Sequence, residues 1–188
     1  QERIDQKTKP IGALGRLEEI ACQLALIQQS EQIEIRQPTM LVFAADHGIA
    51  RHGISIAPSE VTRQMVLNFL AGGAAINCFC RANQIELKVI DAGILTPIDD
   101  EQLINQRVAA GTADLSVEPA MTHEQTQSAL RLGSELAKAQ IAAGCNLLAF
   151  GEMGIGNTTP ASAILAAITG IPVAACVGRG TGIDDEQL

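Results

Sequence analysis

Short apolar runs alternate with longer segments of helical periodicity along most of this chain. Four runs have the length and composition of strands buried on both faces of a parallel sheet: 40–45, 87–91, 146–150 and 173–177. Apolar residues recur at helical spacing in other segments, which predicts helices over 12–29, from 59 to 82 with a break at 71–73, from 122 to 143, and over 160–169. This alternation predicts an α/β fold with a doubly wound, mostly parallel sheet flanked by helices.

The first 35 residues follow a different pattern. They contain one amphipathic helix, with leucine and isoleucine side chains on one face, and no strand. We therefore assign residues 1–35 to an N-terminal helical segment of a smaller subdomain and residues 36–188 to the α/β domain. Residues 96–119 have no clear period and are expected to form loops with one short helix.

Clusters of glycine and polar residues follow all four predicted strands. They are Asp46-His47-Gly48, Asp91-Ala92-Gly93, Gly151–Asn157 and Gly178–Gly182. The carboxyl ends of parallel strands lie at one edge of the sheet, and ligands of such sheets bind beyond that edge. We therefore expect these clusters to form one ligand site.

Residues 151–160 form the most informative of these clusters. Thr158 or Thr159 is suited to cap the helix that follows, and Pro160 fits its first turn. Free amides at the start of a helix, its dipole, and the close approach that glycine permits together favour a bound anion such as phosphate. A tight strand-to-helix turn without any ligand is the alternative interpretation.

This cluster matches neither of the two common phosphate-binding motifs. Asn157 stands where a Walker loop has lysine, and Thr159 stands where the dinucleotide-binding motif has its last small residue. The second mismatch makes a dehydrogenase a weak interpretation. Glu152 adds a carboxylate that would repel a phosphate, so we expect it to have another role or to brace the loop.

Composition excludes several classes of protein. The 188 residues are 47% hydrophobic but only 2% aromatic, so the core is expected to consist of alanine and aliphatic side chains. A net charge of −8 without a basic run or aromatic platforms disfavours nucleic-acid binding. No apolar run approaches the about 20 residues that a membrane-spanning helix needs. Five cysteines and three histidines lack the spacing of a disulfide framework or a metal site, which is typical of a protein of the reducing cytosol.

Further motifs occur in order along the whole chain. They are Lys7-Thr-Lys-Pro10, Gly12-x-Leu-Gly-Arg-Leu-Glu18, Phe43-Ala-Ala-Asp-His-Gly48, Glu60-Val-Thr-x-Gln-Met-Val66, Asn68–Asn77, Asp91-Ala-Gly93, Pro119-Ala-Met121, Gly151–Thr159 and Gly178–Gly182. In these motifs the chain resembles the bacterial nicotinate-nucleotide–dimethylbenzimidazole phosphoribosyltransferase family, over essentially all of its length. The resemblance agrees with a Rossmann-like α/β domain.

The resemblance implies a transfer of phosphoribose from nicotinate mononucleotide to 5,6-dimethylbenzimidazole, a step of cobalamin biosynthesis. The products are α-ribazole 5′-phosphate and nicotinate. It also implies a cytoplasmic homodimer that binds small molecules and neither nucleic acid nor membrane. No cofactor and no metal are expected.

The resemblance also implies roles for particular residues. Phosphate binding is assigned to Gly154, Gly156, Asn157 and Thr158, together with Gly178, Arg179 and Gly180. Glu152 is expected to stabilise positive charge on the ribose, and Gln64 and Met153 to contact the benzimidazole. Asp46 and His47 are expected to support the site. The alternatives are turn geometry for the glycines, a surface charge for Arg179, a loop brace for Glu152, a hydrogen-bonded brace for Asp46 and His47, and packing or surface positions for Gln64 and Met153.

The chain departs from the family in extent. It corresponds to about the first half of a family member, and the Gly-Glu-Gly-Thr-Gly motif that carries the family's principal general base is not in its sequence. We therefore expect the C-terminal part of the fold to be absent, leaving an unpaired sheet edge, and this chain by itself to be inactive or impaired. A non-catalytic fragment that binds a nucleotide or phosphate is the alternative.

Overall fold

The computed structural model describes residues 1–186, and the chain divides into two compact units, residues 1–36 and 37–188. The first unit contains α1 (Glu2–Asp5) and α2 (Arg16–Gln28), so the predicted N-terminal helix is confirmed. Its leucines and isoleucines are largely exposed, whereas Glu18 is buried. The Lys9 Nζ atom lies 2.8 Å from Glu18 Oε1, and hydrogen bonding to Lys9 lowers the pKa of the Glu18 carboxyl. A buried ion pair therefore joins the loop to α2 within this unit.

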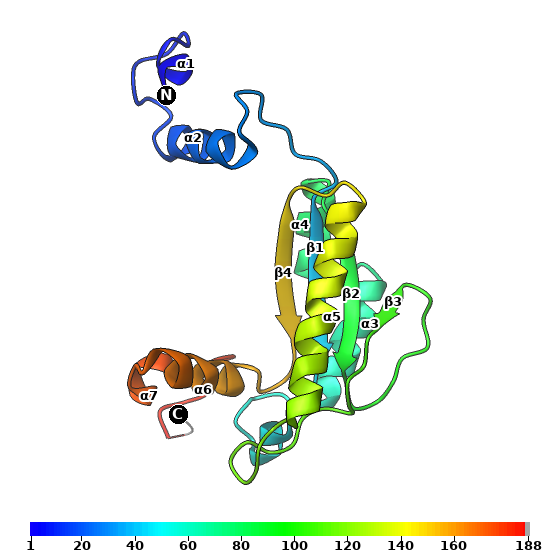
Figure 1. Ribbon diagram of the computed structural model, residues 1–188. Coiled ribbons are helices and arrows are strands. Elements are labelled where there is room, and N and C mark those ends of the chain that lie inside the picture. Colours follow the sequence, from blue (N-terminus) through cyan, green and yellow to red (C-terminus); the bar gives the residue numbers. More distant parts are fainter. Residues whose placement is uncertain (187–188) are drawn as a thin grey trace. The chain divides into compact units, whose positions relative to one another are not determined.

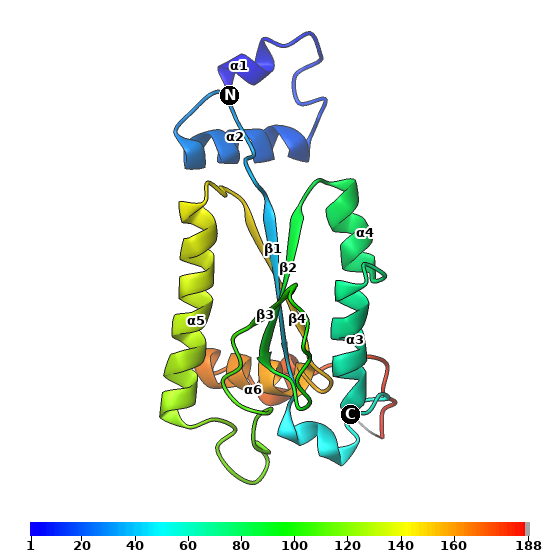
Figure 2. The ribbon, with the colours of Figure 1, turned by 90° about the vertical axis from the view of Figure 1, so that its right-hand side faces the viewer.

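The second unit is a parallel sheet between two layers of helices. Its elements are β1 (Thr39–Ala45), the 3-10 helix η1 (Gly48–His52), α3 (Glu60–Leu70), α4 (Ala75–Ala82), β2 (Glu86–Gly93), β3 (Leu103–Asn105), α5 (His123–Ala142), β4 (Leu148–Met153), α6 (Thr158–Thr169) and α7 (Val173–Cys176). The strand order is β3-β2-β1-β4, and all pairs are parallel. Helix α5 covers one face of the sheet and α3 with α4 the other (Figures 1 and 2). The predicted α/β fold class is confirmed.

The core lies between the sheet and α3. Val42, Val66, Phe69 and Val89 are buried together there, and burying each such side chain stabilises the fold by about 1.5–3 kcal/mol. The stretch Glu60–Ala82 is long and apolar enough to cross a membrane by length and composition alone. This differs from the expectation that no apolar segment of the chain is long enough to do so. The stretch consists of two helices whose apolar side chains enter this core, so we assign it as core structure.

Helix α5 begins as its sequence predicts. The Thr122 hydroxyl accepts a hydrogen bond from the Gln125 amide at 3.1 Å, and the Gln125 side chain accepts one from the Thr122 amide at 2.8 Å. This reciprocal pair is a capping box and satisfies two amides that the helix itself leaves free.

Three predictions about the last third of the chain are wrong. Residues 173–177 form the short helix α7 followed by extended backbone, not a strand. Pro172 fixes the backbone before the turn, and the alanines after it favour helix over sheet. Thr158 and Thr159 are not caps, because α6 begins at Thr158 with Asn157 before it and no capping side chain. Helix α6 has no buried residue, and Ile168 is 79% exposed, so it is not packed on the sheet as its apolar sequence predicts.

Two further differences concern strands. The segment 96–119 contains the three-residue strand β3 and no helix. Strand β4 begins two residues later than predicted and continues through Glu152 and Met153, which were expected in the loop. Gly151 does not end the strand, because its missing side chain leaves room for Val42 of β1; a Cβ atom there would lie 3.1 Å from Val42 Cγ2.

The strand order reverses between β1 and β4. Strand β1 pairs with β2 on one side and with β4 on the other, and the connections to these neighbours run over opposite faces of the sheet. In doubly wound sheets ligands bind at the carboxyl ends of the two strands where the order reverses in this way. The segments that follow β1 and β4 therefore form the expected site.

Candidate functional site

The segments after β1 and β4 are packed directly against each other. Ala44 and Met153 are register partners, so both strands end at the same level. A Cβ atom on Gly154 would lie 2.2 Å from the Ala45 carbonyl oxygen and 2.8 Å from His47 Nε2. Glycine is needed at position 154 because the end of β1 and the His47 ring occupy the space of any side chain.

The turn after Gly154 is fixed by hydrogen bonds at two of its amides. The Ile155 amide donates to the hydroxyl of the buried Thr62 at 3.0 Å, and the Asn157 amide donates to the Gly154 carbonyl at 3.0 Å. Within residues 1–186, the amides of Gly156 and Thr158 have no acceptor. These two amides, at the N-terminus of α6, are the ones left to bind an anion.

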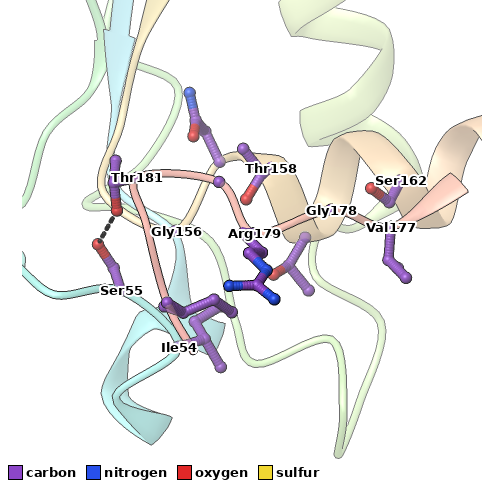
Figure 3. A pocket seen from close by; sticks show the side chains of 13 residues that line it. Ile54, Ser55, Gly156, Thr158, Ser162, Val177, Gly178, Arg179 and Thr181 are labelled. Carbon is purple, nitrogen blue, oxygen red and sulfur yellow. Dashed lines mark hydrogen bonds between the residues drawn. The ribbon is translucent and has the colours of Figure 1, made fainter. Parts of the chain in front are cut away.

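A cavity of about 220 Å³ lies where the start of α6 meets the turn 178–181 (Figure 3). The predicted phosphate-binding residues that line it are Gly156, Asn157, Thr158, Gly178, Arg179 and Gly180. Gly154 is not among the lining residues. Pockets for whole small-molecule ligands span about 300–1,000 Å³, so this cavity suits a phosphate or ribose phosphate better than a complete nucleotide.

The turn 178–181 reaches the cavity although it follows a helix and not a strand. Gly180 has φ +52°, and a Cβ atom there would lie 3.1 Å from Thr158 Oγ1. Glycine at this position permits both the left-handed backbone and the close approach to α6. The guanidinium of Arg179 donates a hydrogen bond to Asp185, so an anion entering the cavity would compete with this carboxylate.

The cavity wall includes hydroxyl groups that were not predicted, among them those of Ser55, Ser162 and Thr181. Ser55 Oγ and Thr181 Oγ1 lie 3.4 Å apart on the wall opposite α6 (Figure 3). Thr181 belongs to a cluster that the sequence had singled out for its glycines. Ser55 lies in the loop after η1, where no local pattern marks it.

Glu152 lies beside the cavity and not in its wall. It pairs with Phe43 of β1, and its side chain is half exposed. Asn157, which does line the cavity, donates a hydrogen bond to Glu152 Oε2, and His47 Nε2 lies 3.8 Å from Glu152 Oε1. The structure therefore brings Glu152, His47 and the anion cavity together through Asn157.

Asp46 has the geometry of a brace. Its side chain is buried, and Oδ2 accepts a hydrogen bond from the Leu95 amide at 2.7 Å. Its backbone carbonyl accepts another from the Thr112 amide at 3.0 Å. Asp46 thus ties the end of β1 to the segment that follows β2 and to the one that follows β3.

The two residues expected to contact a benzimidazole do not line the cavity. Gln64 is exposed on α3, and Met153 packs against the hydrophobic core. Gln64 lies on α3, which contacts both β1 and β4, and Met153 is the last residue of β4. Their placement near these strands is as far as the structure supports the expected role.

No candidate metal centre occurs within residues 1–186, where no three histidine, cysteine or acidic side chains cluster. All five cysteines are free thiols, and burial raises the pKa of the Cys80 thiol.

A second cluster holds the segment after β1 in place. Asp114 is buried, and its carboxylate accepts hydrogen bonds from the Ser116 hydroxyl at 2.7 Å and the Ser116 amide at 3.0 Å. His52 Nε2, at the end of η1, lies 2.6 Å from Asp114 Oδ2. The Ser116 hydrogen bonds, aided by His52, lower the pKa of Asp114 from 3.8 to about 2.

This cluster predicts a pH-dependent contribution to stability. Because the pKa of Asp114 is lowered on folding, its contribution is present above pH 3.8 and is lost as the pH falls toward 2. We expect Asp114→Asn to have a lower free energy of unfolding than the wild type at pH 7. Near pH 2 the free energies of unfolding of the two proteins should become similar. Urea unfolding across this range measures the difference, with the exposed Asp99→Asn as control. A difference that stays constant from pH 7 to pH 2 would refute the role of the Asp114 carboxylate.

Comparison with known proteins agrees with this architecture. A family model described as "Phosphoribosyltransferase" matches residues 1–188. The nicotinate-nucleotide–dimethylbenzimidazole phosphoribosyltransferase of Photobacterium profundum is 62% identical over 189 residues, which cover 100% of this chain and 55% of the relative. The enzyme of the same name from Vibrio cholerae is 60% identical over 194 residues, covering 100% of this chain and 57% of the relative.

A solved structure gives the same result. The crystal structure of CobT from Thermus thermophilus has a TM-score of 0.93 and 50% sequence identity, covering 98% of this chain and 56% of that chain. This chain thus spans about half the length of the relatives that it matches. The chain belongs to the nicotinate-nucleotide–dimethylbenzimidazole phosphoribosyltransferase family.

Proposed function

We propose that this protein transfers phosphoribose from nicotinate mononucleotide to 5,6-dimethylbenzimidazole, giving α-ribazole 5′-phosphate and nicotinate in cobalamin biosynthesis. The observation that carries the proposal is the cavity of about 220 Å³ lined by Arg179 and by Gly156 and Thr158, whose amides have no acceptor within residues 1–186, with Glu152 linked to it through Asn157. The names of its relatives state the same donor and acceptor.

The proposed roles follow from charge. The substrate phosphate accepts hydrogen bonds from the Gly156 and Thr158 amides and pairs with Arg179, at the positive end of the α6 dipole. Breaking the bond between ribose and nicotinate places positive charge on the ribose ring. Glu152, held by Asn157 and facing His47, stabilises that charge. Gln64 and Met153 contact the benzimidazole.

Removal of the benzimidazole proton requires a base that we do not assign within this chain. The family's Gly-Glu-Gly-Thr-Gly motif is not in these 188 residues. We therefore propose that the chain supplies the phosphoribosyl-binding half of the site and is inactive or impaired by itself. The second candidate function is binding of a nucleotide without turnover. The lack of the Gly-Glu-Gly-Thr-Gly motif in these 188 residues favours this candidate as well.

We also propose a domain organisation, a cellular location and an oligomeric state for the protein. Residues 1–35 belong to a small helical subdomain, and residues 36–188 form the phosphoribosyl-binding domain. The protein acts in the cytoplasm as a homodimer on small-molecule substrates and binds neither nucleic acid nor membrane.

Binding and turnover distinguish the two candidates. Calorimetry with nicotinate mononucleotide measures binding, and mass spectrometry after addition of dimethylbenzimidazole detects α-ribazole 5′-phosphate. We expect this chain to bind the mononucleotide. If this chain formed α-ribazole 5′-phosphate as fast as a full-length relative, the proposal that it lacks the general base would be wrong. If it did not bind nicotinate mononucleotide, the proposed phosphate site would be wrong.

Arg179→Ala tests the phosphate contact. Loss of a hydrogen bond to a charged group costs about 1.5–3 kcal/mol, so we expect the dissociation constant for nicotinate mononucleotide to rise about tenfold to hundredfold. Calorimetry measures this change, with the exposed Arg131→Ala on α5 as a control of equal charge. Equal affinities for the Arg179 and Arg131 variants would remove Arg179 from the site.

A further inference from the structure

The buried hydroxyl of Thr62 has a role that the fold alone does not require. Thr62 lies on α3 with 0% exposure. A buried hydroxyl is unfavourable unless it is hydrogen-bonded, and an apolar side chain of the same shape would fill this position more simply. The hydroxyl oxygen accepts a hydrogen bond at 3.0 Å from the Ile155 amide, which lies 93 residues away in the sequence.

Ile155 lies at the centre of the anion-binding turn. It is buried and is flanked by Gly154 and Gly156, which have the widest backbone freedom of any residue type. Gly154 is confined by the end of β1. Gly156, at φ +84°, is confined by Ala50, whose Cβ would lie 3.2 Å from a Cβ atom at position 156. Between them, the hydrogen bond to Thr62 fixes the direction of the Ile155 peptide.

That direction determines where the next amides lie. The Gly156 and Thr158 amides follow Ile155 by one and three residues and are those left without an acceptor within residues 1–186. If the Ile155 amide lost Thr62, it would be buried without a partner, and the flexible glycines would let the turn rotate toward another acceptor. The Gly156 amide, next in the chain, would then change its direction as well.

We infer that Thr62 is a positioning residue for the anion-binding turn: its hydroxyl orients the Ile155 peptide and thereby aims the free amides of Gly156 and Thr158 into the cavity. This inference rests on the proposed function for the identity of the ligand, but not for the geometry of the turn. It adds to the site a residue on α3 that does not itself contact the ligand.

Three variants separate positioning from stability. Thr62→Val keeps the shape and removes the hydroxyl, whereas Thr62→Ser keeps the hydroxyl. Val66→Ala, one turn further along α3, destabilises the same helix without touching the turn, because Val66 is buried in the core. All variants are measured at a temperature where unfolding experiments show them to be folded.

The binding measurement uses nicotinate mononucleotide and inorganic phosphate as probes. We expect Thr62→Val to raise both dissociation constants about tenfold, which corresponds to about 1.4 kcal/mol. Thr62→Ser and Val66→Ala should remain within about twofold of the wild type. Equal binding by the Val and Ser variants, or an equal loss in Val66→Ala, would overturn the positioning role.

A measurement without ligand keeps the inference independent of the proposed function. Amide hydrogen exchange of Ile155 should be about tenfold faster in Thr62→Val than in the wild type, and unchanged in Val66→Ala. Unchanged Ile155 exchange in Thr62→Val would overturn the inference even if the ligand still binds. If the wild type binds neither probe, the proposed phosphate site fails, and exchange alone decides whether Thr62 orients the turn.

Discussion

Replacing Gly154 by alanine is expected to lower the free energy of unfolding by about 3 kcal/mol and to abolish binding of nicotinate mononucleotide. The added Cβ atom would lie 2.2 Å from the Ala45 carbonyl oxygen, which is backbone and cannot move without displacing the end of β1. It would also lie 2.8 Å from His47 Nε2. The strand ends would separate at the point from which the anion-binding turn starts.

The matched control for this prediction is Gly133→Ala in α5. Position 133 lies inside a helix, and a Cβ atom added there would meet no atom within 4 Å, so alanine should stabilise the protein by about 0.5–1 kcal/mol. Urea unfolding measures the free energy of unfolding of both variants, which should decrease for Gly154→Ala and increase for Gly133→Ala. A Gly154→Ala variant as stable as the wild type would contradict the described packing of β1 against the turn.

Replacing Glu152 by glutamine is expected to lower turnover about 10²-fold in the protein as its gene encodes it. Glutamine keeps the shape but removes the negative charge that we propose to stabilise the ribose cation. The charge matters most when the bond to nicotinate breaks, so kcat should fall more than KM for nicotinate mononucleotide rises. Mass spectrometry or chromatography of α-ribazole 5′-phosphate over time measures both constants.

Glu86→Gln is the control for the loss of a carboxylate. Glu86 begins β2 at the opposite, amino end of the sheet and is exposed. It should leave turnover unchanged. If Glu152→Gln retained more than about a third of the wild-type kcat, Glu152 would be a brace for Asn157 and not a catalytic residue.

The sheet and most helices were predictable because their signals are local. Apolar runs marked three of the four strands, and Thr122 with Gln125 marked the start of α5. Strand β3 has only three residues, too few for any periodicity. Residues 173–176 form a helix where the sequence predicts a strand, because a short apolar run is equally compatible with either element.

The site was predictable in its residues but not in its contacts. Glycine at positions 154, 156 and 180 was expected to approach a ligand. The structure adds that Ala45, Ala50 and Thr158 occupy the space next to these glycines. Such reasons depend on pairs far apart in the sequence, like Thr62 with Ile155, which no local pattern contains. The sequence likewise does not indicate that the Asn157 amide donates to the Gly154 carbonyl and so is not free for an anion.

The central claim is that the start of α6 and the turn 178–181 hold the phosphate of the substrate while Glu152 faces its ribose. A crystal structure of the protein with nicotinate mononucleotide tests this most directly. We predict phosphate oxygens at hydrogen-bond distance, about 2.7–3.2 Å, from the Gly156 and Thr158 amides and near Arg179, with the ribose beside Glu152. A phosphate bound outside this cavity, or a ribose remote from Glu152, would contradict the account.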